Sequence, residues 1–143
     1  MNDLEIAIAR LRKERVAIAI VKNGEVLFET RSRRISGFLE AIDRLDGQLE
    51  SSSIADRVAG KAVALLCVYI DAKAVYSDVL GKQARIVLDE HGVKCSWRDL
   101  VENILNSDRS DLCPFEKAAE TISDPSEAYC TFLKLQKTLS LKE

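Results

Sequence analysis

The spacing of apolar residues along the chain predicts an entry helix followed by a hairpin. Apolar residues recur every three to four positions over residues 3–13, which is typical of an amphipathic helix. Residues 16–21 are a continuous, largely β-branched apolar run, and residues 26–28 are a second one. Asn23 and Gly24 lie between them, and this pair favours a tight hairpin turn because both central positions need a positive φ.

The rest of the chain predicts strands that alternate with helices. Helices are expected over residues 36–46, 56–70 and 82–90 and from residues 114 and 125, and strands over residues 74–80 and 93–97. This order implies parallel strands joined by right-handed helical crossovers. We therefore expect an α/β fold, a three-layer α/β/α sandwich whose mixed sheet opens with an antiparallel hairpin. Residues 1–143 are expected to form one domain.

The segment from Asp56 to Ile70 predicts a central helix that brings charges to one end of the molecule. From Ala62 onward it is apolar on every side, as in a helix buried all round, while charged residues stand at its beginning. Gly60 inside it would cost about 1 kcal/mol relative to alanine. We therefore expect another group to approach the backbone at Gly60 closely.

Composition then removes several classes of function. Lysine and arginine number 21 against 23 acidic residues, a net charge of -2, which argues against general nucleic-acid binding. The longest apolar run, residues 62–70, is far shorter than the roughly 20 residues of a membrane span. The acidic start lacks the pattern of a secretory signal, so a cytoplasmic protein is expected. The wide spacing of the cysteines predicts that they are reduced thiols. Because His91 is the single histidine, a metal site with several histidines of one chain is excluded.

Cys113 is the sharpest candidate for chemistry. Pro114 follows it at the expected first position of a helix, so Cys113 is the predicted N-cap. A thiol there faces free backbone N–H groups and the positive end of the helix dipole, which favours the reactive thiolate. Asp111 and Glu116 oppose that charge. In the alternative interpretation Cys113 is a small packed hydrophobe, and Glu116 closes a capping box onto its backbone.

Asp56 and Lys61 form the second candidate. Lys61 stands where the helix becomes wholly apolar, and a buried ammonium needs a partner, for which Asp56 is available in the sequence. The pair can serve a ligand or catalysis, with Asp56 holding Lys61. It can equally be a structural ion pair, with Asp56 as an ordinary helix cap.

A basic loop at Arg31, Arg33 and Arg34 is a weaker candidate. Guanidinium groups offer a planar fork of donors to a phosphate or carboxylate. Three arginines in a loop are also typical of a solvated surface, and the sequence leaves both interpretations open.

Four segments carry a resemblance to a known family: Lys22 to Glu25, Ala55 to Leu66, Val75 to Asp78 and Leu112 to Lys117. Through them, residues 16–119 resemble the bacterial family called domain of unknown function 1893 (DUF1893). It implies a cytidine-deaminase-like fold. The last helix, residues 124–143, lies outside the part that resembles the family.

That fold normally holds zinc at two helix starts, through a His-or-Cys-x-Glu motif and a Pro-Cys-x-x-Cys motif. The resemblance implies that both motifs are degraded here. Asp56 stands where the first ligand would start, Val58 where the proton-shuttling glutamate is needed, and the second motif begins at Cys113. We therefore expect no metal and no other cofactor, with a set of Asp56, Cys113 and Glu116 as the metal-binding alternative.

Two hypotheses follow for a pocket where the two helix starts meet. In the first, the pocket binds a small polar or nucleotide-like molecule, with Cys113 as nucleophile, Lys61 as its charge partner and Asp56 holding Lys61. In the second, the protein is a non-enzymatic binding or self-assembly module, and these residues are caps and ion pairs. Its last helix, with the apolar residues Phe132, Leu135 and Leu139, would then support a homo-oligomer.

Overall fold

The computed structural model describes residues 1–13, 15–32, 35–104 and 113–141. In these residues the strands form one sheet in the order β2-β1-β3-β4-β5. The strands are β1 (Ile18–Lys22), β2 (Glu25–Thr30), β3 (Ser53–Ala59), β4 (Ala74–Gly81) and β5 (Lys94–Val101). The helices are α1 (Asp3–Leu11), α2 (Ile35–Leu45), α3 (Lys61–Tyr69), α4 (Lys82–Glu90), α5 (Pro114–Ala119) and α6 (Pro125–Leu141), with a 3-10 turn η1 (Asp46–Leu49) after α2. The α/β class and the mixed sheet are as expected.

The opening hairpin forms as its sequence predicts. Asn23 and Gly24 have φ values of 52° and 78°, the positive values that the tight turn requires. The carboxylate of Asp3, at the start of α1, accepts hydrogen bonds from the backbone N–H groups of both residues, at 2.9 and 2.8 Å. The entry helix is therefore fastened to the tip of the hairpin.

The expected helix over residues 56–70 is wrong in its first part. Residues 53–59 form β3, the middle strand of the sheet, which pairs antiparallel with β1 and parallel with β4. The helix begins only at Lys61, after Gly60 as its N-cap. The physical reason is that β3 pairs with a neighbouring strand on each side. This pairing outweighs the local preference for a helix start that the charges of Asp56 and Arg57 suggest.

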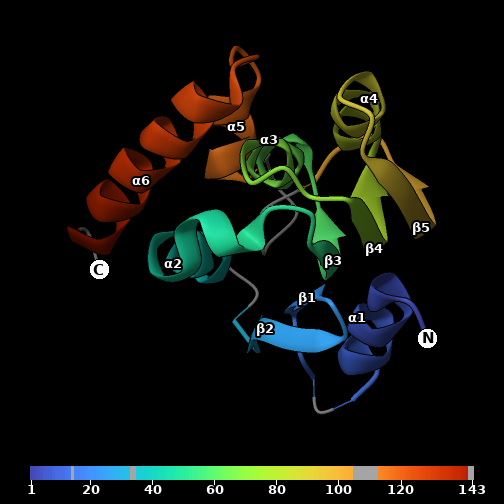
Figure 1. The fold of residues 1–143 in the computed structure, drawn as a ribbon. Helices are drawn as coiled ribbons and strands as arrows, with labels where there is room; N and C mark the ends of the chain where they lie inside the picture. The colour runs from blue at the N-terminus through green and yellow to red at the C-terminus, as the bar shows by residue number, and fades with distance from the viewer. Residues whose placement is uncertain (14, 33–34, 105–112, 142–143) are drawn as a thin grey trace.

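The helices cover the two faces of the sheet unequally (Figure 1). On one face, α1 packs through Ala7 and Leu11 on a small apolar core with Ala19 and Ala55. The other face carries the larger core, to which α2, α3, α4, α5 and α6 contribute. The expected three-layer arrangement is confirmed. None of the helices in the described ranges is long and apolar enough to cross a membrane.

Much of the apolar face of α6 is buried against other elements of the chain. Phe132 and Ala128 are fully buried, and α6 packs mainly on α3. Phe132 also meets Phe115 of α5 edge to face, with 5.9 Å between ring centroids. Phe132 is therefore a core residue here, while Leu135 remains only partly covered.

Strands β3, β4 and β5 run parallel, and their carboxyl ends meet at one edge of the sheet. They end at Ala59, Gly81 and Val101. Helices α3 and α4 begin directly after the first two of these ends. Ligands of open α/β sheets bind in crevices outside the carboxyl ends of strands, so this edge is where a site is expected.

Candidate functional site

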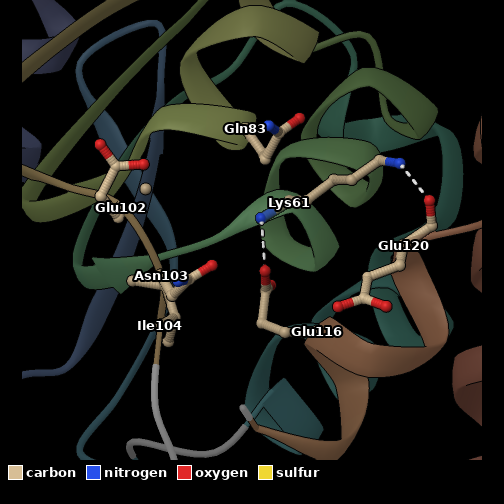
Figure 2. A pocket seen from close by; sticks show the side chains of 8 residues that line it. Lys61, Gln83, Glu102, Asn103, Ile104, Glu116 and Glu120 are labelled. Carbon is tan, nitrogen blue, oxygen red and sulfur yellow. Dashed lines mark hydrogen bonds between the residues drawn. The ribbon is translucent and has the colours of Figure 1, made fainter.

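A pocket of about 350 Å³ lies at the carboxyl edge of the parallel strands, and we call it the strand-end pocket. It is lined by Lys61, Gly81, Gln83, Glu102, Asn103, Ile104, Glu116 and Glu120. These residues come from the end of β4, the starts of α3 and α4, the chain after β5, and α5 with the residue that follows it (Figure 2). Apart from glycine and one isoleucine the lining is polar, with carboxylates, amides and one ammonium.

Glu116, in the first turn of α5, caps the start of α3. Its carboxylate accepts hydrogen bonds from the backbone N–H of Lys61 at 3.0 Å and from that of Ala62 at 2.8 Å. Burial raises the pKa of Glu116 above its ordinary value, although these two hydrogen bonds oppose the shift. The positive end of α3 is thus occupied by an anion from the chain itself.

Gly60 makes this contact sterically feasible. A Cβ atom at this position would lie 2.3 Å from Oε1 of Glu116 and 2.6 Å from Oε2. No side chain fits between the backbone and the carboxylate. The expectation that another group approaches Gly60 closely is therefore confirmed, and that group is Glu116.

Lys61 lies at the pocket, but not in the environment that its sequence position predicts. It is partly exposed, and its Nζ donates to the backbone carbonyl oxygen of Glu120 at 3.3 Å, as Figure 2 shows. In the described part of the chain no ion pair joins Lys61 to Asp56. The expected buried ammonium is wrong because Lys61 is the first residue of its helix, where the side chain reaches outward to α5.

Asp56 does not line the strand-end pocket. It lies within β3 rather than at a helix start, and it lines a second cavity that shares no lining residue with that pocket. Burial raises the pKa of its carboxyl to about 7, against the effect of hydrogen bonds from the backbone N–H groups of Val58 and Arg57. The charge of Asp78 adds to the increase. Asp56 is thus neither the cap of α3 nor the holder of Lys61.

Cys113 is the N-cap of α5, with Pro114 in the first helical position, as expected. Its thiol makes no capping hydrogen bond, and the side chain is partly buried. Its backbone N–H donates to the carbonyl oxygen of Ile104, a lining residue, at 3.3 Å. The expected capping box is wrong, because the carboxylate of Glu116 turns to α3 instead. A catalytic role for Cys113 stays a prediction.

The expected meeting of two helix starts therefore occurs through a different residue. The start of α3 contacts the first turn of α5 through Glu116, while Cys113 is not a lining residue and contacts the pocket through its backbone hydrogen bond to Ile104. Sequence reasoning missed Gln83 and Asn103 as lining residues. Their signal was positional, since Gln83 follows the end of β4 by two residues and Asn103 follows the end of β5 by two.

The residues that the structure describes do not fit a zinc site. No group of three or more histidine, cysteine, aspartate or glutamate side chains in the described ranges is arranged to hold a metal ion. The alternative set of Asp56, Cys113 and Glu116 is not brought together, since Asp56 lines the other cavity and Glu116 caps α3. Of the basic loop, Arg33 and Arg34 lie outside the described residues.

Comparison with known sequences identifies one family. The family described as TM1506, a domain of unknown function (DUF1893), matches residues 6–135. The match extends beyond the expected residues 16–119 at both ends and includes most of α6. No curated protein matches the chain.

Solved structures resemble the whole fold or part of it. The crystal structure of a DUF1893 family protein (TM1506) from Thermotoga maritima is 26% identical and has a TM-score of 0.85, covering 93% of this chain and 89% of that one. The dCMP deaminase of the cyanophage S-TIM5 is 15% identical, with a TM-score of 0.49 over 69% of this chain and 94% of its own. RibD of Acinetobacter baumannii is 14% identical, with a TM-score of 0.46 over 66% of this chain and 33% of its own. These last two likenesses carry no conclusion about the function of this chain.

Proposed function

Because this chain belongs to the DUF1893 family, a family of unknown function, we propose a function from the site itself: the protein binds a small polar molecule in the strand-end pocket. The proposal extends to the kind of molecule. The pocket selects uncharged or positively charged polar groups, such as those of a nucleoside, over phosphates.

The observation that carries this proposal is the carboxylate of Glu116 at the start of α3. A helix start beside a strand end is a typical place for phosphate, because its free N–H groups and dipole attract anions. Here two of those N–H groups already donate to Glu116. A phosphate at the same place would meet a negative charge instead of free donors.

The remaining lining supports a neutral or cationic ligand. The lining holds three carboxylates, those of Glu102, Glu116 and Glu120. Against them stands the ammonium group of Lys61. The amides of Gln83 and Asn103 each offer both donors and an acceptor, which suits ring nitrogens, carbonyls and hydroxyls. The side chain of Asn103 points toward Glu116 in Figure 2, so the two can contact one ligand.

A covalent step at Cys113 is a second candidate function, favoured by one contact. The hydrogen bond from Cys113 to Ile104 places the start of α5 next to the pocket rim. In this version the thiolate adds to the carbon of a bound carbonyl group, the π electrons of the C=O bond move to its oxygen, and that oxygen takes up the proton that the thiol gave up, with Lys61 as the positively charged partner. The binding proposal does not depend on this step.

A nuclear magnetic resonance titration tests the binding proposal. The backbone amide signals of Lys61, Gln83 and Asn103 are followed while a panel of nucleosides, free amino acids, sugars and simple amines is added, together with the 5′-monophosphate of each nucleoside. We expect members of the neutral or cationic set to shift these signals, and each monophosphate to bind more weakly than its nucleoside.

Variants show whether the shifts come from the pocket. Asn103→Ala and Gln83→Ala should weaken binding, while Gln48→Ala, an exposed glutamine in η1, should leave it unchanged. A panel in which no compound shifts the three signals overturns the proposal. So does tighter binding of the monophosphates than of the nucleosides.

A further inference from the structure

The second cavity, about 230 Å³ in volume, is lined mainly by residues of strands β3, β4 and β5, and we call it the arginine pocket. It is lined by Ala17, Asp56, Arg57, Val58, Asp78, Val79 and Arg98. None of these residues lines the strand-end pocket.

Three arginines and two aspartates meet at this cavity. The buried carboxylate of Asp78 accepts hydrogen bonds from Arg12 at 3.0 Å and from the hydroxyl of Tyr76 at 2.7 Å, and Arg57 approaches it to 3.5 Å. Arg98 faces the same carboxylate and helps to lower its pKa. Asp56 also lines the cavity, but burial raises the pKa of its carboxyl to about 7, so below that pH it is largely uncharged and the three guanidinium groups outnumber the charge of Asp78.

The arginines differ in what they can still bind. Arg57 is held in place, since its Nε and Nη2 donate to the carbonyl oxygens of Val16 and Leu11 at 2.8 and 2.5 Å. Arg98 donates through Nε to Asp99 at 3.1 Å, and its terminal nitrogens Nη1 and Nη2 have no partner in the described part of the chain. Its side chain is 61% exposed, so it can turn toward a ligand.

The cavity also has an apolar wall. Val58 is 46% exposed, an unusual degree for a valine in the central strand of a sheet, and Val79 pairs with it on β4. An anionic group at the arginines would leave the rest of a small molecule in contact with these valines.

We propose that the arginine pocket is a binding site for a small oxyanion, the phosphate or carboxylate group of a small molecule. The terminal nitrogens of Arg98 hold the oxygen atoms, since a guanidinium offers two parallel donors to such a group. Arg57 supplies the fixed positive charge behind them, and Asp78 keeps Arg57 and Arg12 in place. This site is separate from the strand-end pocket and has the opposite charge preference.

A titration with two simple anions tests the proposal. Inorganic phosphate and acetate are added separately at constant ionic strength, adjusted with sodium chloride, and the amide signals of Val58 and Val79 are followed by nuclear magnetic resonance. We expect saturable shifts with at least one anion, and the comparison distinguishes a phosphate site from a carboxylate site. Arg98→Ala should weaken binding about fivefold or more, and Arg98→Lys by about twofold to threefold, because lysine keeps the charge and loses the fork.

Arg44→Ala is the matched control. Arg44 is 63% exposed, close to the exposure of Arg98, and its guanidinium pairs with Glu40 on α2. The proposal is overturned if Arg98→Ala binds both anions as tightly as the unaltered protein. It is equally overturned if neither anion shifts Val58 and Val79, or if Arg44→Ala weakens binding as much as Arg98→Ala. Asn103→Ala, which alters only the strand-end pocket, should leave anion binding unchanged and so keeps the two proposals apart.

Discussion

Replacing Gly60 by alanine perturbs the contact that joins α3 to α5. The new Cβ would lie 2.3 Å from Oε1 of Glu116, so the carboxylate has to leave. Because the glutamate side chain is flexible, the overlap itself is relieved by rotation. The cost is then the loss of the hydrogen bonds to Lys61 and Ala62.

The expected magnitude follows from those two bonds. Loss of a helix N-cap costs about 1 kcal/mol, and a hydrogen bond to a charged group contributes about 1.5–3 kcal/mol. Since water can reach part of this site, we expect Gly60→Ala to lower the free energy of unfolding by about 2 kcal/mol. Glu116→Ala removes the same bonds and should cost about as much.

The double variant makes the prediction specific. With alanine at both positions there is no carboxylate left to displace, so Gly60→Ala with Glu116→Ala should cost little more than Glu116→Ala alone. Urea denaturation followed by circular dichroism measures all three. Gly47→Ala is the control, because a Cβ there meets nothing within 4 Å. The reasoning is refuted if Gly60→Ala costs no more than Gly47→Ala, or if the two single losses add in the double variant.

Three further predictions concern titration and reactivity. Burial raises the pKa of Asp56 to about 7, so the contribution of its protonated carboxyl to stability is complete below about pH 4 and is lost as the pH rises through 7. In urea denaturations at a series of pH values, Asp56→Asn should remove this fall in the free energy of unfolding. An unchanged pH dependence between pH 4 and 7 would contradict the raised pKa of Asp56. Burial raises the pKa of Asp78, but hydrogen bonds from Tyr76 and Arg12 outweigh this effect and lower the pKa, so the free energy of unfolding should fall as the pH drops below about 4. Asp78→Asn should weaken that acid sensitivity, and an unchanged sensitivity in this variant would contradict the role given to these bonds. If Cys113 is a nucleophile, iodoacetamide should modify it below pH 7 faster than the exposed Cys130, as read by mass spectrometry, and equal rates would remove this candidate function.

Local patterns were sufficient for the elements whose signals are local. The Asn23-Gly24 turn needs positive φ at both positions, and α4 buries Ala84, Val87 and Leu88 on one face. Pro114 likewise marks the start of α5. In each case the residues that decide the structure lie within a few positions of one another.

Local patterns did not predict strand β3 or the cap of α3, because both depend on contacts with residues far along the chain. Charges at Asp56 and Arg57 suggested a helix start, but Arg57 is satisfied by carbonyl oxygens of Leu11 and Val16, more than 40 residues away. The cap of α3 comes from Glu116, 55 residues beyond Lys61. Gly60 gave the one local sign of this contact, because a glycine before an apolar helix implied a close neighbour without identifying it.

A crystal structure with a bound compound tests the central claim most directly. The strongest neutral or cationic compound from the titration panel would be crystallised with the protein. We predict electron density for it between Lys61, Gln83 and Asn103, with Glu116 still bonded to the start of α3. Density for the compound outside this pocket, or a structure in which Glu116 has left α3 to make room for a negatively charged group, would contradict the account.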